Sequence, residues 1–207
     1  WITVLHTFTY CNALQRALAR APSVELVRGL CHGALSVYLD RFLNVPPARL
    51  PEPAAVGAGG ARVGADVLPG AKSGGAVVAK GTLVGPGGDV DPAAFRRRFL
   101  DLLDAQQQVK AAAELAAAYL DAGGDEAPFW RTLGEALLRE DAEFHTFQMF
   151  EAGHSQWRLW PKGSPQRRLI ALATIRYLAG HSPTPRESPK VADIALRLHK
   201  GEKLFEE

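Results

Sequence analysis

The stretch Glu140–Ala152, EDAEFHTFQMFEA, decides how the middle of this chain folds. Helical steps of three or four residues place Gln148, His145 and Asp141 on one face, and the turns before them carry leucines on that same face. A helix in a globular protein normally turns apolar residues toward the core. Either this face is exposed to solvent, or its polar groups take part in binding or catalysis inside a helical bundle.

Bulk composition narrows the class of protein. The chain has 207 residues, of which 47% are hydrophobic and 22% charged, which is ordinary for a soluble globular protein with a buried core. A net charge of +2 does not favour nucleic acid as a partner. No apolar run reaches the ~18 residues of a transmembrane helix. We therefore expect a cytoplasmic protein that binds neither nucleic acid nor membrane.

The two cysteines, Cys11 and Cys31, are too few for a disulfide framework in a chain of this length. The sequence has no CxxC and no CxH paired with a CxxH, so it carries no zinc ribbon or Rieske cluster of its own. We expect two buried thiols in a reducing compartment. The chain starts at Trp1 rather than at a methionine, which we interpret as a fragment of a longer polypeptide.

Hydrophobic periodicity and capping residues predict an all-α fold, a multi-helix bundle of about six helices in a single domain over residues 1–207. Ser23, Asp91 and Ser164 are typical N-caps, and Pro92 and Pro165 suit the first helical position. The predicted helices span residues of about 2–20, 24–43, 91–121, 127–153, 164–179 and 188–201.

Residues 51–90 differ from the rest of the chain, since eleven glycines and four prolines fall in these forty positions. A connection of this length without structure is unusual inside a compact domain. The segment GGAVVAKGTLVG within it has the β-branched residues and glycines of a short hairpin. The whole region is either a long arm that lies over the helical body or a neighbouring subunit, or a flexible linker.

Asp141 and His145 are the first candidates for a functional site. Four residues apart on the predicted helix 127–153, their side chains emerge on one face. A carboxylate beside an imidazole orients the ring and raises its basicity, which suits a general base or a metal ligand. Both are therefore candidate catalytic residues. The structural alternative is a pair that ties this helix to a neighbour or faces solvent.

Other polar residues join them as candidates. His6 lies in LHTFTYCNA, which is similar to FHTFQMFEA around His145. The similarity makes Asn12 on the first helix and Gln148 on the second candidates for polar residues that face the core. His32 stands between small residues that permit close approach, with Asp40 two turns further along. The expected metal ligands are His6, His32, Asp141 and His145, with Glu140 and Asp40 in reserve.

The kind of metal follows from the donor set. A di-iron carboxylate centre would require Glu-x-x-His on each of two helices, and this pattern is not met. A mononuclear site with imidazole and carboxylate ligands suits iron, zinc or copper. The sequence contains neither GxSxG nor GxxxxGK[ST].

Five stretches carry a resemblance to a known group. The sequence at HTFTYCNAL, RGLCHGALSVYLDRFLNVPPARLP, FLDLLDAQQQVKAAAELAAAYL, LLREDAEFHTFQMFEA and IRYLAGHSPT resembles the helical region of bacterial proteins associated with a Rieske-type [2Fe-2S] domain, themselves distantly similar to questin-oxidase-like oxygenases. The resemblance implies an electron-donating Rieske partner outside this sequence. It also implies a set of site positions, namely His6, His32, Asp40, Glu140, Asp141, His145 and His181.

Two functions compete at this level. The first is an oxygenase or other redox component, with a metal or acid–base site inside the bundle and electrons supplied by the Rieske-type domain. The second is a noncatalytic helical module that binds a partner chain or an apolar small molecule, with Trp157 and Trp160 among its contacts. Loss of metal on substitution of His145 would separate the two.

Overall fold

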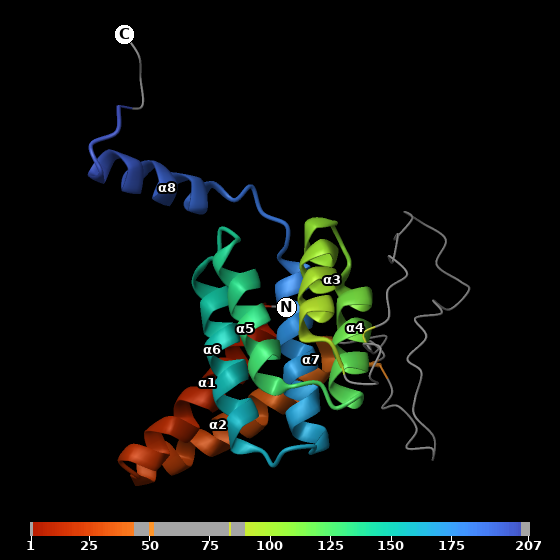
Figure 1. The fold of residues 1–207 in the computed structure, drawn as a ribbon. Helices are drawn as coiled ribbons and strands as arrows, with labels where there is room; N and C mark the ends of the chain where they lie inside the picture. The colour runs from red at the N-terminus through yellow and green to blue at the C-terminus, as the bar shows by residue number, and fades with distance from the viewer. Residues whose placement is uncertain (1, 44–49, 52–82, 84–89, 204–207) are drawn as a thin grey trace. The chain divides into compact units, whose positions relative to one another are not determined.

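The computed structural model describes residues 2–43, 50–51, 83 and 90–203. Within these ranges the chain is helical, which confirms the all-α class (Figure 1). The expected 51–90 arm and its hairpin lie outside the described residues, apart from Pro51, Leu83 and Val90. The elements are α1 Ile2–Arg20, α2 Val24–Asp40, the 3₁₀ turn η1 Arg41–Leu43, α3 Pro92–Asp104, α4 Val109–Asp121, α5 Glu126–Leu138, α6 Phe144–Leu159, α7 Pro165–Gly180 and α8 Glu187–His199.

The predicted N-caps Ser23, Asp91 and Ser164 are confirmed, whereas the helix expected from residue 188 already begins at Glu187. The Ser23 hydroxyl accepts a hydrogen bond from the Leu26 amide at 3.3 Å, and the Asp91 carboxylate accepts one from the Ala93 amide at 2.8 Å. Ser164 accepts from the Arg167 amide at 3.2 Å. Each side chain satisfies an amide that the first turn of its helix leaves without an intrahelical partner.

Two of the predicted helices are wrong in length, because each is divided in the structure. The run 91–121 breaks after Asp104, and Gln107 adopts a left-handed φ of 63° before α4 begins. The run 127–153 breaks at residues 139–143 between α5 and α6. Neither break contains glycine or proline, so no local breaker signalled it. The described residues therefore form eight α-helices rather than six.

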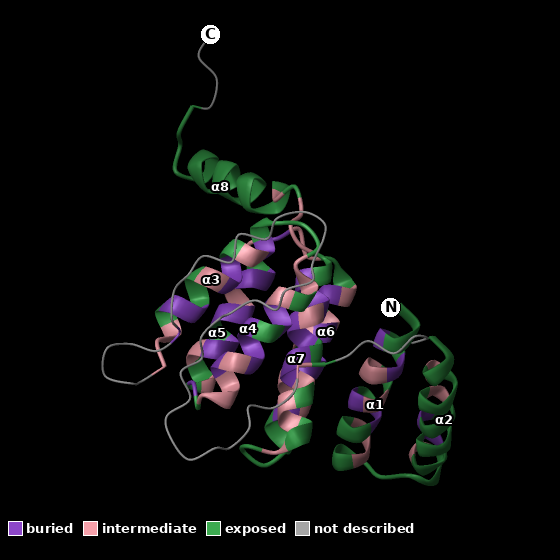
Figure 2. Cartoon of the chain, turned by 90° about the vertical axis from the view of Figure 1, so that its right-hand side faces the viewer, coloured by how far each residue is buried: buried purple, intermediate pink, exposed green. Residues whose placement is uncertain are grey.

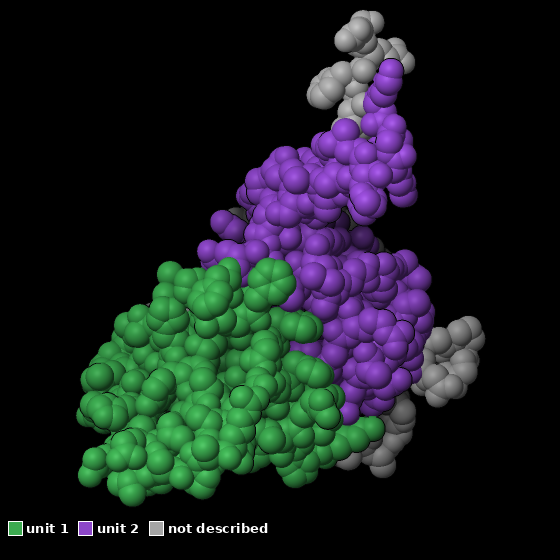
Figure 3. Space-filling view, turned by 90° about the vertical axis from the view of Figure 1, so that its left-hand side faces the viewer, with its two compact units in different colours: residues 1–51, 144–174 green, residues 52–143, 175–207 purple. Residues whose placement is uncertain are grey.

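The chain divides into two compact units (Figure 3). Unit 1 comprises Trp1–Pro51 and Phe144–Thr174, and unit 2 comprises Glu52–Glu143 and Ile175–Glu207. One boundary falls between α5 and α6, and the other falls within α7. Each unit is described separately below.

Unit 2 has an aromatic core. Phe95 and Phe99 on α3 pack with Tyr119 on α4 and Phe129 on α5, and all four side chains are fully buried. The ring centroid of Phe95 lies 4.4 Å from that of Tyr119 and 5.4 Å from that of Phe129. Burial raises the pKa of Tyr119 to about 12, and its hydroxyl donates to the Asp125 carbonyl at 2.8 Å. Each such ring contributes about 1.5–3 kcal/mol by leaving water.

Unit 1 is built on the hairpin of α1 and α2, with α6 packed against α1. Gly29 and Gly33 let the two helices approach closely. A Cβ at Gly29 would lie 3.0 Å from Leu14 Cδ1 and from the Tyr10 hydroxyl, and one at Gly33 would lie 3.3 Å from Cys11 Sγ. The Tyr10 hydroxyl also donates to the Gly29 carbonyl at 3.0 Å.

The environment of the cysteines corrects one expectation. Cys31 is exposed on α2, and Cys11 is half-buried between α1 and α2, so the two thiols are free but are not both in the core. Burial raises the pKa of the Cys11 thiol.

Exposure is uneven along the described helices (Figure 2). α2 buries only two glycines and α8 buries no residue, whereas α3, α4 and α5 each bury several apolar side chains. Among the described residues, no helix is both long enough and apolar enough to cross a membrane.

Candidate functional site

His6 on α1 and His145 on α6 meet in unit 1. Their Nε2 atoms lie 3.1 Å apart, and their rings stack with centroids 5.2 Å apart and planes inclined by 29°. In the neutral pair one Nε2–H donates and the other Nε2 accepts, and the tautomers follow from this contact. His6 is exposed and His145 is half-buried, so solvent reaches the pair.

The two helices run parallel and in register. The sequence offset between His6 and His145 is 139 residues, and the Asn12–Glu151 contact has the same offset. Both helices rise by the same distance per residue, so in a parallel pair a constant sequence offset places equivalent residues at the same level along the helix axes. The repeated His-Thr-Phe tripeptides are thus brought side by side, and the threonine of each, Thr7 and Thr146, is buried.

A polar network continues this seam beyond the histidines. Asn12 is 4% exposed, and its Nδ2 donates to Glu151 Oε2 at 3.1 Å. The amide of Gln156 donates to Asn12 Oδ1 at 2.8 Å, and the Ser155 hydroxyl donates to Glu151 Oε1 at 2.8 Å. Arg16 forms an ion pair with the same carboxylate. Asn12 was a candidate inward residue, and its burial confirms that part of the expectation.

Glu151 and His154 form the single Glu-x-x-His of the sequence. The Glu151 carboxylate is engaged by Asn12 and its neighbours, whereas the ring of His154 stacks on that of Trp157 at 6.0 Å. Burial and the charge of Arg158 lower the pKa of His154, against the opposing effect of Glu151.

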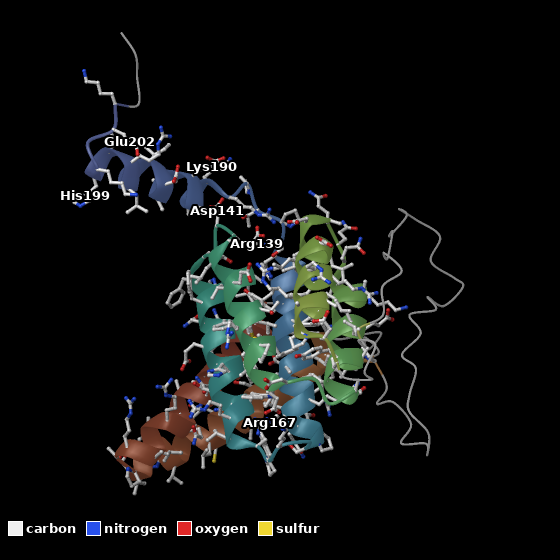
Figure 4. All side chains as sticks on the ribbon, viewed as in Figure 1. Arg139, Asp141, Arg167, Lys190, His199 and Glu202 are labelled. Carbon is white, nitrogen blue, oxygen red and sulfur yellow. The ribbon has the colours of Figure 1, made fainter. Side chains whose placement is uncertain are left out.

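Asp141 does not pair with His145 on one helix, and that prediction is wrong. Asp141 lies in the connection that follows α5, and its carboxylate binds the first turn of α8 in unit 2 (Figure 4). Oδ2 accepts from the Glu187 amide at 2.9 Å and Oδ1 from the Ser188 amide at 2.6 Å. These backbone hydrogen bonds lower the pKa of Asp141. The Asp141 side chain therefore caps the N-terminus of α8, although the two are more than forty residues apart in the sequence.

Glu140 next to it is the most heavily bonded carboxylate among the described residues of unit 2. Its Oε1 accepts from Arg186 Nη2 at 2.7 Å and Nε at 3.0 Å, and lies 3.2 Å from Arg139 Nε. Its Oε2 accepts from the amide and the hydroxyl of Thr184 at 2.8 and 2.9 Å. Burial alone would raise the pKa of Glu140, but the hydrogen bonds of Arg186 and Thr184 lower it.

Arg186 and Arg139 extend the Glu140 cluster to α3. Arg139 Nη2 donates to Asp104 Oδ1 and to the Leu100 carbonyl, each at 2.8 Å, and Arg186 also forms an ion pair with Asp104. Hydrogen bonds from these carboxylates raise the pKa of Arg186, whose backbone has a left-handed φ of 59°. The Glu140 cluster thus holds the end of α5, the end of α3 and the start of α8 together. Arg186 had no periodic or motif signal in the sequence, and Thr184 was marked only as the last residue of the IRYLAGHSPT stretch.

The remaining expected residues lie elsewhere. His32 is exposed on α2, and Asp40 is the last residue of that helix. His181 follows α7, where its ring stacks on Tyr177 with centroids 4.0 Å apart and its Nδ1 lies 2.8 Å from the Tyr177 carbonyl. His181 thus contacts the last turn of α7 through both its ring face and its Nδ1.

Of the four expected ligands, the structure brings together His6 and His145. In the part of the chain that the structure describes, no group of three or more His, Cys, Asp or Glu side chains could hold a metal ion. The arrangement that remains is a pair of imidazoles at the surface of a polar helix seam. Comparisons of this chain with protein-family models, curated proteins and solved structures gave no match.

Proposed function

We propose that His6 and His145 form a two-imidazole site for a transition metal ion, and that this chain is the helical component of an oxygenase-like redox protein. The observation that carries the proposal is the 3.1 Å separation of the two Nε2 atoms. Two metal–nitrogen bonds of about 2.0–2.1 Å that meet at roughly 100° hold their nitrogens about 3.1 Å apart. The rings therefore already have the spacing of two neighbouring ligands of one ion.

The chemistry of the donors limits the metal. Two neutral imidazoles suit iron, zinc or copper better than magnesium or calcium, which prefer oxygen ligands. With only two protein ligands, positions remain for water or substrate, which is the requirement for catalysis rather than for a structural site. A redox-active ion held there would supply oxygen activation, and its electrons would come from a separate donor, for which the Rieske-type domain of the resembling proteins is the candidate.

The rest of the seam positions the two ligands. The network of Asn12 and Glu151 fixes α1 against α6 in the register that brings His6 to His145. Burial of Thr7 and Thr146 beside the histidines keeps the helix backbones close. Contacts of this kind around a ligating side chain hold it in place and tune its affinity for the ion.

The test is metal content and metal titration on protein purified without a histidine tag. Zn²⁺ and Fe²⁺ should bind with about one ion per chain by elemental analysis after dialysis, and Co²⁺ should give visible absorption bands from imidazole ligation. His6→Ala and His145→Ala should each abolish this binding. His199→Ala, which removes an exposed histidine from α8, is the matched control and should keep it. Binding that survives in both seam variants, or absence of binding in the unaltered chain, would overturn the proposal.

A second candidate function has an observation of its own. The outward face of α2 carries several apolar side chains that are more than half exposed, which favours a noncatalytic module that binds a partner. Such a module would keep its partner affinity in His145→Ala, whereas a redox component would lose its metal and its activity.

A further inference from the structure

The solvent-facing side of α2 is apolar where a surface helix normally carries charges. Gly29 and Gly33 face α1, and helical steps of 100° per residue place a stripe of larger residues on the opposite side. Between Arg28 and Asp40 the helix has no Lys, Arg, Asp or Glu. The stripe, called the α2 stripe below, consists of Val24, Val27, Cys31, Leu35, Tyr38 and Phe42, the last of them in η1.

The α2 stripe is large enough to be an interface. Exposed fractions are 63% for Val24, 53% for Val27, 56% for Leu35, 51% for Tyr38 and 60% for Phe42. Together these side chains and Cys31 offer on the order of 600 Å², about three quarters of the ~800 Å² that each partner contributes to a standard interface. At one end of the stripe the Arg41 guanidinium stacks over the Tyr38 and Phe42 rings. A contiguous apolar patch of this size on a soluble protein marks a contact with another molecule.

Four members of the α2 stripe lie symmetrically about Cys31, whereas Phe42 has no counterpart within α2. Val27 precedes Cys31 by four residues and Leu35 follows it by four. Val24 precedes it by seven and Tyr38 follows it by seven. In an antiparallel pair of α2 helices with a two-fold axis through Cys31, Val27 of one copy faces Leu35 of the other, and Val24 faces Tyr38. This is the self-complementarity that an isologous interface requires.

The intervals along the α2 stripe are three, four, four, three and four residues. They keep the residues on one helix face, but the two successive steps of four at Cys31 interrupt the alternating a/d spacing of a coiled coil. The small Cys31 at the centre permits a close approach of the two backbones. A second copy of the chain presents the required pattern without any further assumption about a partner.

We propose that two copies of this protein associate through antiparallel pairing of their α2 stripes, with Cys31 at the two-fold axis. This interface uses residues on the side of α2 opposite α1, so it does not involve the His6–His145 pair. The proposal is therefore independent of the proposed metal site, and either can fail without the other.

The first test is the mass of the full chain in solution. Sedimentation equilibrium between 1 and 100 µM should give a mass twice that of the 22.3 kDa chain at the higher concentrations. Val27→Glu and Leu35→Glu place charges in the interface and should each return the mass to that of a monomer, with the helical circular dichroism unchanged.

Val191→Glu is the matched control, because Val191 is 61% exposed on α8 and should not affect the dimer. A monomer at 100 µM would overturn the proposal. So would a dimer that resists both α2 substitutions, or one that only Val191→Glu dissociates.

The second test fixes the orientation of the pair. Both native cysteines are replaced by serine, and Val27→Cys and Leu35→Cys chains are prepared separately. Copper phenanthroline in air is the oxidant. Each cross-link joins two thiols, and the two electrons and two protons released pass to oxygen. A disulfide should form in the mixture of the two chains and not in the Val27→Cys chain alone. Cross-linking of Val27→Cys with itself would indicate parallel helices and would overturn the antiparallel arrangement.

Discussion

Glu140 and His145 are five residues apart in the sequence, yet they belong to two different kinds of polar cluster. Glu140 is 7% exposed and accepts four hydrogen bonds from Arg186 and Thr184. His145 is half-buried and meets the exposed His6 through one ring nitrogen. The first cluster is closed around a buried charge, whereas the second is open to water.

The difference separates a structural cluster from the histidine pair that we propose as a metal site. A buried carboxylate is tolerated only when donors satisfy both of its oxygens, and a carboxylate so satisfied has little capacity left for a ligand. An exposed pair of imidazoles costs little to keep and stays accessible to an ion. Polar residues on a predicted apolar face therefore do not all indicate a site, and the number of partners that the fold supplies distinguishes them.

The largest loss of stability is expected from a substitution in the Glu140 cluster. Glu140→Gln removes the buried charge that Arg186 and Arg139 neutralise, and these half-buried guanidinium groups then keep only Asp104 as a counter-ion. Loss of one member of a buried ion pair costs up to about 3–5 kcal/mol, so the free energy of unfolding in urea should fall by up to that amount. Glu114→Gln is the control, since Glu114 is exposed and its pair with Lys110 at 3.7 Å should contribute about 0.5 kcal/mol or less. Equal losses in the two variants would contradict a closed cluster.

The Glu140 cluster should also make the free energy of unfolding depend on pH in acid. The pKa of Glu140 is lower in the folded chain than its ordinary value, because hydrogen bonds from Arg186 and Thr184 outweigh burial. A carboxyl of this kind stabilises the fold above its unfolded pKa of about 4.3, and the contribution is lost as pH falls through the folded pKa. We expect the free energy of unfolding to drop below about pH 4.3 in the unaltered chain and to drop less in Glu140→Gln. Urea midpoints measured from pH 3 to pH 7 check this, and parallel curves would contradict it.

A smaller effect on stability is expected at the open pair. His6→Ala removes one hydrogen bond from an exposed side chain, so the free energy of unfolding should fall by no more than about 1.5 kcal/mol. Thermal and urea unfolding at neutral pH measure it. A loss as large as that of Glu140→Gln would show that the histidine pair is structural and would remove the distinction between the clusters.

The smallest effect is expected from Asp141. Asp141→Ala deprives the amides of Glu187 and Ser188 of their acceptors, so hydrogen exchange at the start of α8 should accelerate. The global unfolding midpoint should not change, because no residue of α8 is buried. Exchange measured by mass spectrometry on peptides of residues 184–199 tests this, with peptides of α3 as an internal reference. A shift of the global midpoint would show that α8 is part of the cooperative core.

Much of the fold was predictable because it depends on neighbours in the sequence. Periodicity predicted the helical class, and Ser23, Asp91 and Ser164 begin their helices as expected. The echo between the two His-Thr-Phe tripeptides indicated similar surroundings for His6 and His145. Their direct contact was not predictable, because the parallel register of α1 and α6 depends on packing between segments that are 139 residues apart.

The sequence by itself determined where helices form and which faces are polar, since both follow from residues within a turn or two of each other. Only the tertiary structure decided that residues 139–143 leave the helix. Glu140 and Asp141 find their hydrogen-bond partners in Thr184, Arg186 and the start of α8, more than forty residues later. Those contacts make the break between α5 and α6 more stable than a continuous helix, because they satisfy the buried charge of Glu140 and cap α8. A pattern of local spacing contains no information about such distant partners.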